Sequence, residues 1–229
     1  MPADRRCLLI GNTRWHWADQ TPSGWRFEHT PPNPTALASA DLTLWAAVGP
    51  VPTHPVLDRT RRLTLEDVPL KGMPPWLGVD RALAAWSALK TSPACDQAGM
   101  LVADAGTVLS LTRVSADGQF MGGQLAAGFA LQLRAMSSGT RNLAMPVDSE
   151  PTSVPASQQP FPQATDAAMQ RGVLQSLVGL LLEAQRDCAW PLWLCGGDAP
   201  RLSSALRRRG CDLVLAPDLV MQGLVSLLS

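Results

Sequence analysis

Three glycine-bearing turns, each directly after an apolar run, are the features of this chain best suited to chemistry. They are Leu8-Leu9-Ile10-Gly11-Asn12-Thr13, Leu101-Val102-Ala103-Asp104-Ala105-Gly106-Thr107 and Leu192-Trp193-Leu194-Cys195-Gly196-Gly197-Asp198. Glycine lets the backbone approach a ligand closely, and successive N–H groups in such a turn can bind an anion. A single turn of this kind is common in α/β proteins. Three of them, two with a threonine after the glycine, predict a split phosphate clamp that holds a nucleotide between two related halves.

Asp80 is the main candidate for a catalytic carboxylate. It lies in Gly78-Val79-Asp80-Arg81, at the start of a segment whose apolar residues recur with a helical period as far as Leu89. A carboxylate beside an arginine stays ionised and can accept a proton, and the arginine can hold a carboxylated substrate. Phosphoryl transfer uses such a carboxylate to orient the attacking hydroxyl. The competing interpretation of Asp80 is a plain helix N-cap.

The first half of the chain is predicted to hold strands followed by one helix. Residues 6–18 indicate a strand, a turn and a second strand, in which His16 lies on the face opposite Trp15 and Trp17 and is structural rather than catalytic. The proline-rich segment 21–35 predicts a loop with a short edge strand at 25–27. Further strands are predicted at 42–48 and 63–68, before a helix at 80–89.

The second half repeats this beginning and adds more helices. After the strand at 101–103, the dipeptide Asp117-Gly118 predicts a hairpin between strands at 108–114 and 119–121. The remaining predictions are a helix at 129–138, a proline-rich loop at 146–162, a helix at 165–187, a strand at 192–195, a helix at 199–209, a strand at 212–216 and a helix at 218–228. The apolar run 173–182 exceeds what one buried helix face needs, which favours either a core or a homodimer interface.

Both halves thus begin with a strand, a glycine–threonine turn and a strand, which indicates duplicated mixed α/β domains. The polar break at 91–98 is the predicted seam, with one domain over 1–95 and the other over 96–229. A GxGxxG motif that opens a helix after the first strand is absent from the sequence, as is GxxxxGK[ST]. A singly wound dinucleotide-binding fold and a P-loop kinase are therefore disfavoured.

Composition excludes several other classes of protein. The formal net charge is +0, so nothing favours nucleic acid or an anionic membrane as a partner. The five cysteines are scattered and the three histidines have no metal-ligand spacing, which argues against a disulfide framework or a zinc site. The sequence also has no apolar span of membrane-crossing length and no signal-peptide core. We expect a cytoplasmic protein.

Taken together, five motifs resemble the type III pantothenate kinase family. They are Ile10-Gly11-Asn12-Thr13, Gly78-Val79-Asp80-Arg81, Asp104-Ala105-Gly106-Thr107, Gly122-Gly123-Gln124-Leu125-Ala126-Ala127-Gly128 and Gly196-Gly197-Asp198, and their order matches the family from about residue 8 to residue 216. The resemblance implies two ribonuclease-H-like domains of the actin-like ATPase superfamily with a nucleotide cleft between them, paired in a homodimer. It implies ATP-dependent phosphorylation of pantothenate to 4'-phosphopantothenate, the first step of coenzyme A biosynthesis.

The resemblance also assigns roles to individual residues. Asp80 corresponds to the acceptor of the hydroxyl proton, and Asp104 to the ligand of a monovalent cation, potassium or ammonium. The pantothenate site would be formed by Gly78, Val79, Asp80, Arg81 and Thr165. The ATP site would be formed by Gly11, Asn12, Thr13, Thr107, Gly196 and Gly197.

Two positions depart from the family pattern. The first turn of the family carries an aspartate that serves phosphate-bound magnesium, and Leu9 stands there in this chain. An apolar side chain cannot bind a metal ion, so another group replaces it or activity is reduced. The family also places a tyrosine before Gly-x-Asp-Arg, whereas this chain contains no tyrosine and has Trp76 as the candidate apolar wall. The resemblance therefore leaves two alternatives open: a non-catalytic nucleotide-binding regulator of the Bvg accessory factor type, and a phosphohydrolase.

Overall fold

The computed structural model describes residues 5–92, 99–146 and 159–228 and divides the chain into two compact units. Unit 1 comprises Met1–Pro93, Gly118–Phe120 and Asp218–Ser229, and unit 2 comprises Ala94–Asp117 and Met121–Pro217. The last segment of the chain therefore belongs to unit 1, whereas the sequence placed it in the second half. Most of the seam predicted at 91–98 lies outside the described residues. The predicted boundary between 1–95 and 96–229 remains a proposal.

Unit 1 is built on a four-stranded sheet in the order β3-β2-β1-β4. Its strands are β1 (Arg6–Ile10), β2 (Trp15–Thr21), β3 (Gly24–Thr30) and β4 (Leu44–Ala47). β1 pairs antiparallel with β2 and parallel with β4, and β2 pairs antiparallel with β3. One face of β1 and β2 carries Leu8, Ile10, Trp15 and Trp17, which are buried in a core cluster. His16 is only half-buried, because alternation along β2 turns it to the opposite face, as predicted.

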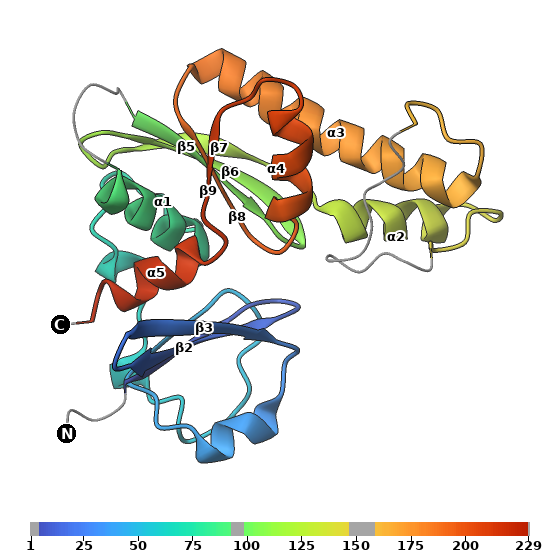
Figure 1. Cartoon of the computed structure of the whole chain (residues 1–229). Coiled ribbons are helices and arrows are strands. Elements are labelled where there is room, and N and C mark those ends of the chain that lie inside the picture. The colour runs from blue at the N-terminus through green and yellow to red at the C-terminus, as the bar shows by residue number, and fades with distance from the viewer. Residues whose placement is uncertain (1–4, 93–98, 147–158, 229) are drawn as a thin grey trace. The chain divides into compact units, whose positions relative to one another are not determined.

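Two helices of unit 1 pack against each other, α1 (Val79–Thr91) and α5 (Leu219–Val225), as Figure 1 shows. Their contact is close because Gly223 lies against the backbone of Leu83, where a Cβ would come within 2.3 Å of the Leu83 oxygen. The indole nitrogen of Trp86 also donates a hydrogen bond of 3.1 Å to Ser226 Oγ. Short 3₁₀ helices at Pro34–Ser39, Arg59–Arg61 and Leu65–Asp67 complete this unit.

Unit 2 contains a five-stranded sheet in the order β7-β6-β5-β8-β9 (Figure 1). The strands are β5 (Gly99–Ala105), β6 (Val108–Ser115), β7 (Phe120–Ala127), β8 (Leu192–Cys195) and β9 (Leu213–Leu215). β5 pairs antiparallel with β6 and parallel with β8, and β8 pairs parallel with β9. The helices are α2 (Phe129–Gly139), α3 (Thr165–Cys188) and α4 (Ala199–Arg207). Side chains from all three helices and from the sheet share one core cluster.

The apolar run of α3 is largely used inside unit 2. Met169, Val173, Leu174, Leu177, Val178, Leu181 and Ala184 are buried in the core cluster, and Leu180 and Leu182 pack against it. The other face of the helix exposes Gln175, Ser176 and Gly179. Val173–Leu182 is therefore an amphipathic stripe on a core rather than an all-round apolar surface, and the run alone gives no argument for a homodimer.

The two sheets repeat one topology. The order β3-β2-β1-β4 matches β7-β6-β5-β8, with antiparallel and parallel pairings at corresponding places. Unit 2 adds β9 beside β8. At the corresponding edge of unit 1, beside β4, Arg62 forms a single parallel bridge to Trp45. The duplication expected from the glycine turns is thus present in the fold.

Three predicted elements need correction. Residues 63–68 do not form a strand, because a capping box between Thr64 and Asp67 starts a 3₁₀ turn at Leu65. The edge strand predicted at 25–27 is the seven-residue β3, which extends to Thr30. The strand predicted at 119–121 is the eight-residue β7, which continues through Gly122 and Gly123 to Ala127. Gly122 has a φ of +89°, so a glycine allows the strand to pass this point.

Candidate functional site

The Gly11 turn begins where β1 ends and is closed by a backbone hydrogen bond of 3.0 Å from Gly11 N to Arg14 O. Asn12 and Thr13 are exposed at its tip. Gly49, which follows β4, lies against the turn: a Cβ at this position would come within 2.2 Å of Gly11 O. Gly49 follows the strand predicted at 42–48, but no motif in the sequence marked it as part of this turn. The contact leaves the tip of the turn as its accessible part.

The Gly106 turn has the same construction at the end of β5. Its closing bond runs 3.3 Å from Gly106 N to Val108 O. Two glycines from elsewhere in unit 2 lie against it: a Cβ at Gly128 would come within 2.1 Å of Gly106 O, and one at Gly196 within 2.4 Å of Asp104 Oδ1. Asp198 N, two residues after Gly196, donates a bond of 2.9 Å to Ala105 O. The structure therefore brings together Asp104, Thr107 and Gly196, all predicted from the sequence.

Asp80 is the second residue of α1, and the N-cap of this helix is Gly78. The interpretation of Asp80 as the N-cap is therefore wrong. Asp80 Oδ1 accepts a hydrogen bond of 2.8 Å from Arg81 N. Burial raises the pKa of the Asp80 carboxyl, while this hydrogen bond and the Arg81 charge lower it. A carboxyl with a raised pKa is suited to accept a proton in a reaction near neutral pH.

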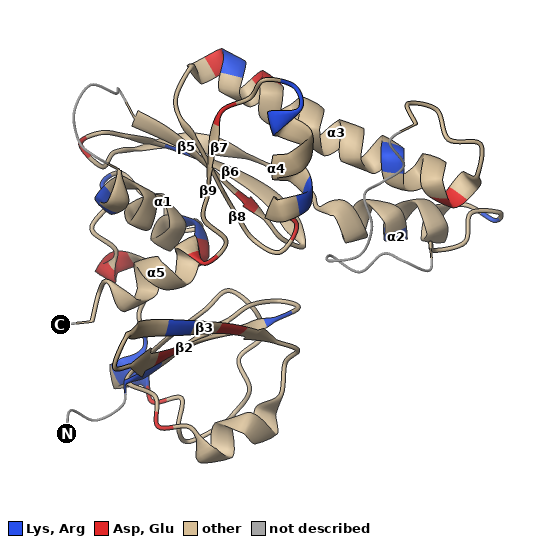
Figure 2. Ribbon diagram, in the orientation of Figure 1, with Lys and Arg blue, Asp and Glu red and all other residues tan. Residues whose placement is uncertain are grey.

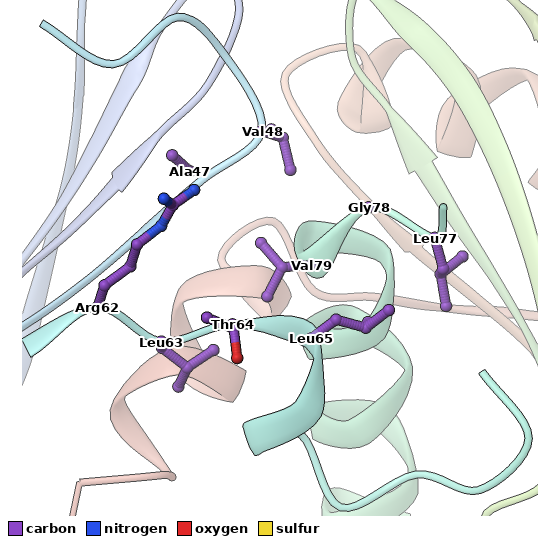
Figure 3. Close-up of a pocket in the computed structure, with 9 residues that line it drawn as sticks. All are labelled: Ala47, Val48, Arg62, Leu63, Thr64, Leu65, Leu77, Gly78 and Val79. Carbon is purple, nitrogen blue, oxygen red and sulfur yellow. The ribbon is translucent and has the colours of Figure 1, made fainter. Parts of the chain in front are cut away.

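A pocket of about 280 Å³ opens beside the Gly-x-Asp-Arg motif in unit 1. Figure 3 shows its lining residues, which are Ala47, Val48, Arg62, Leu63, Thr64, Leu65, Leu77, Gly78 and Val79. Most of the wall is apolar, with Arg62 and Thr64 as the side chains able to bind a polar group. The Arg62 guanidinium also lies 5.1 Å from the centroid of the Trp45 ring. Sequence reasoning missed Arg62, which carries no motif around it.

Two residues predicted for the substrate site, Trp76 and Thr165, do not line this pocket. Trp76 is 73% exposed and is not among the residues that line this pocket. The apolar wall is supplied by Leu65, Leu77 and Val79. Thr165 is exposed at the first residue of α3 in unit 2. The substrate-binding roles of Trp76 and Thr165 remain predictions.

The side chains fit a cation at the second turn better than at the first. Asp104 places a carboxylate oxygen beside Gly196 and the backbone of Ala105, and oxygen ligands suit potassium and other hard cations. In the first turn the corresponding residue is Leu9, which is buried and offers no ligand. Among the described residues, groups of three or more histidine, cysteine, aspartate or glutamate side chains that could hold a metal ion do not occur.

Figure 2 shows basic and acidic segments interspersed in each unit rather than separated by sign. Within the described ranges, no helix is long and apolar enough to cross a membrane.

Comparison with known proteins identifies the family. The sequence model of type III pantothenate kinase matches residues 66–186. The type III pantothenate kinase of Thermosynechococcus vestitus is 37% identical over 216 residues, which cover 87% of this chain and 80% of that protein. The type III pantothenate kinase of Synechococcus elongatus is 32% identical over 248 residues, covering 96% and 94%.

Solved structures with low sequence identity confirm the fold class. A Baf family transcriptional activator from Campylobacter jejuni has a TM-score of 0.62 at 17% identity, covering 97% of this chain and 96% of its own. The activator of 2-hydroxyisocaproyl-CoA dehydratase from Clostridium difficile, solved with ADPNP, has a TM-score of 0.57 at 11% identity, covering 98% and 92%. The chain therefore has the predicted α/β fold of two ribonuclease-H-like domains.

Proposed function

Since this chain belongs to the type III pantothenate kinase family, we propose that it phosphorylates pantothenate with ATP, giving 4'-phosphopantothenate and ADP. This reaction is the first step of coenzyme A biosynthesis. The observation that carries the assignment within this chain is Asp80, a carboxylate of raised pKa in the first turn of α1, next to a pocket lined by Gly78 and Val79.

Asp80 is the residue that accepts the proton. The pantothenate hydroxyl oxygen attacks the γ-phosphorus, the bond to the β–γ bridging oxygen breaks, and ADP leaves with that electron pair. The hydroxyl proton passes to Asp80 Oδ2 or Oδ1. Positioning of the hydroxyl is the main requirement of such a reaction, and α1 is a rigid element on which to hold the carboxylate.

The unit 1 pocket is the proposed pantothenate site, together with Gly78, Val79, Asp80 and Arg81. Pantothenate combines an apolar dimethyl group with a carboxylate, which matches an apolar wall that carries one guanidinium, that of Arg62. Arg62→Gln should raise KM for pantothenate with a smaller effect on kcat, because the carboxylate lies away from the reacting hydroxyl.

The ATP phosphates are proposed to contact the glycine turns, at Gly11, Asn12 and Thr13 in unit 1 and at Thr107, Gly196 and Gly197 in unit 2. Asp104 is the proposed ligand of a monovalent cation, potassium or ammonium, which offsets phosphate charge when bound. Magnesium would accompany the phosphates of ATP. A homodimer and a cytoplasmic location complete the proposal. Light scattering at micromolar concentration tests the dimer, and a monomer would overturn it.

An ADP-release assay with and without pantothenate tests the function. Release that depends on pantothenate supports the kinase. Release without pantothenate would indicate a phosphohydrolase. ATP binding with no release under several mono- and divalent cations would leave the Bvg accessory factor type of regulator, the alternative that Leu9 favours.

A further inference from the structure

Three polar side chains of unit 1 form a hydrogen-bonded chain that begins at the Gly11 turn. His16 Nδ1 lies 2.7 Å from His29 Nδ1, and His29 Nε2 lies 2.9 Å from Asp218 Oδ1. The other ring nitrogen of His16, Nε2, faces the turn: a Cβ on Gly11 would lie 3.4 Å from it. The chain of contacts thus joins the turn to the start of α5.

The sheet register explains why these side chains meet. Leu9 pairs with His16 across β1 and β2, and His16 pairs with His29 across β2 and β3. Residues directly opposite each other in antiparallel strands project from the same face. Leu9, His16 and His29 therefore form one row across the sheet. The helix α5 contacts β1 and β2 and brings Asp218 to the His29 end of this row.

The same row in unit 2 has a different chemical character. There the residue two places before the turn glycine is Asp104, whose cross-strand partner is Ser110. In unit 1 the corresponding pair is Leu9 and His16. The first turn thus lacks the carboxylate of the second, and an imidazole stands opposite the place where a carboxylate would be.

We propose that His16 is a phosphate-binding residue, which donates from Nε2 to a nucleotide phosphate at the Gly11 turn, and that its contacts with His29 and Asp218 support the proton it takes up for this purpose. This inference rests on the proposed function, because it requires ATP phosphates at the turn. An imidazole N–H contacts a phosphate oxygen directly, whereas a carboxylate at position 9 would need a metal ion in between.

The proton count of the chain follows from its geometry. An ionised Asp218 accepts from His29 Nε2, and the short contact between the two Nδ1 atoms holds one proton. With both rings neutral, His16 must carry that proton, so its Nε2 is a bare acceptor. One added proton makes Nε2 a donor, wherever the shared proton lies. Phosphate binding at this position therefore takes up one proton.

The charged groups around His16 favour its protonation only when an anion is bound beside it. Burial, followed by the charges of His29 and Arg14, lowers the pKa of His16 to about 4 in the ligand-free chain. Leu9 and Gly11 from the β1 side carry no charge, and α5 contributes Asp218 through His29. A phosphate oxygen beside Nε2 would stabilise the protonated ring and raise its pKa again.

Calorimetric titration of ATP without pantothenate, in buffers of different ionisation enthalpy near pH 5, measures the protons taken up on binding, because one charge-assisted hydrogen bond raises the pKa of His16 from about 4 by roughly one to two units. The wild-type chain should take up a substantial fraction of one proton more than His16→Gln does, and its affinity should fall by up to tenfold for each unit of rising pH in this range. His16→Gln should abolish this additional uptake and weaken binding at this pH by up to about tenfold. His54→Gln is the control on a histidine of unit 1 outside this chain of contacts and should behave as wild type.

Asp218→Asn provides a second variant at a partly exposed position, in case His16→Gln does not fold. It removes the negative charge at the end of the chain of contacts, which helps to hold the added proton, and should reduce the proton uptake. Long-range ¹H–¹⁵N NMR adds a direct test, since His16 Nε2 should change from the pyridine-like to the pyrrole-like range when ATP binds. Equal uptake in wild type, His16→Gln and Asp218→Asn, or an unchanged Nε2 signal, would overturn the inference.

The outcome is separable from that of the proposed function. A chain with normal pantothenate-dependent ADP release but no His16-dependent proton uptake would refute the phosphate contact alone. Proton-linked ATP binding without any pantothenate-dependent release would support the contact and refute the kinase.

Discussion

Gly196 lies directly against Asp104, so that a Cβ at residue 196 would come within 2.4 Å of Asp104 Oδ1 and 2.6 Å of Ala105 O. Gly196 also has a backbone φ of +89°, which residues other than glycine rarely adopt. The turn after β8 therefore holds the Asp104 carboxylate in place, and the two motifs that carry these residues act as one structural unit.

Gly196→Ala should displace Asp104 and lower kcat/KM by at least about tenfold, because moving a functional group by about 1 Å can reduce the rate by even more. Gly139→Ala is the matched control, because a Cβ at Gly139, the last residue of α2, meets nothing within 4 Å and the residue has no proposed role in binding. Steady-state ADP release compares the two variants. Equal activity of Gly196→Ala and Gly139→Ala would contradict a functional role for the close contact.

Asp104→Asn should raise the potassium concentration needed for half-maximal activity by roughly 10- to 100-fold, because it removes one charged ligand. ADP release measured over a potassium or ammonium titration gives this constant. Asp187→Asn, at an exposed position near the end of α3, should leave it unchanged. An unaltered potassium dependence in Asp104→Asn would show that the cation binds elsewhere or is not used.

Asp80→Asn should lower kcat by about 10²–10⁴-fold, the contribution of a positioned general base. ATP affinity should change little. In the wild type, activity should fall on the acid side with an apparent pKa above the ordinary range of aspartate, because burial raises the pKa of Asp80. Asp58→Asn is a suitable control, because Asp58 is a true N-cap: its Oδ1 accepts a hydrogen bond of 2.8 Å from Thr60 N at the start of a 3₁₀ helix. Near-normal turnover of Asp80→Asn would move the base elsewhere.

Asp80→Asn should stabilise the fold at neutral pH, although it lowers turnover. A carboxyl whose pKa is higher in the folded than in the unfolded chain stabilises the fold below its unfolded pKa, and this contribution is lost as the pH rises through the folded pKa. Asp80 is of this kind, so its ionised form is unfavourable at neutral pH. Asp80→Asn should therefore raise the urea midpoint at pH 7 while it lowers turnover, and this difference should vanish in acid.

The sequence predicted the elements whose patterns are local. The hairpin at Asp117-Gly118, α3 and β8 have their expected positions, since turn chemistry and periodicity act over short distances. The 63–68 error was avoidable, because Thr64 and Asp67 form a capping-box spacing. The contact of His29 with Asp218, across 189 residues, leaves no local pattern, and neither does the position of Arg62 in the pocket.

The packing of α5 on α1 gives a prediction about stability. Gly223→Ala would place a Cβ 2.3 Å from Leu83 O and 2.8 Å from Leu83 C, both backbone atoms that cannot move aside alone. The helices must separate, at a cost of about 1–3 kcal/mol in the free energy of unfolding.

Gly179→Ala is the opposite case, because its Cβ on the exposed face of α3 meets nothing within 4 Å. It should stabilise unit 2 by up to about 1 kcal/mol through helix propensity.

Tryptophan fluorescence during urea unfolding can measure the loss in Gly223→Ala, since all eight tryptophans except Trp190 and Trp193 lie in unit 1. Trp86 is a close reporter, because its indole nitrogen donates to Ser226, the residue that follows α5. The expected result is a lower midpoint for Gly223→Ala, and far-UV circular dichroism should show an unchanged or higher midpoint for Gly179→Ala. A Gly223→Ala chain as stable as wild type would show that α5 does not pack on Leu83 as closely as this structure has it.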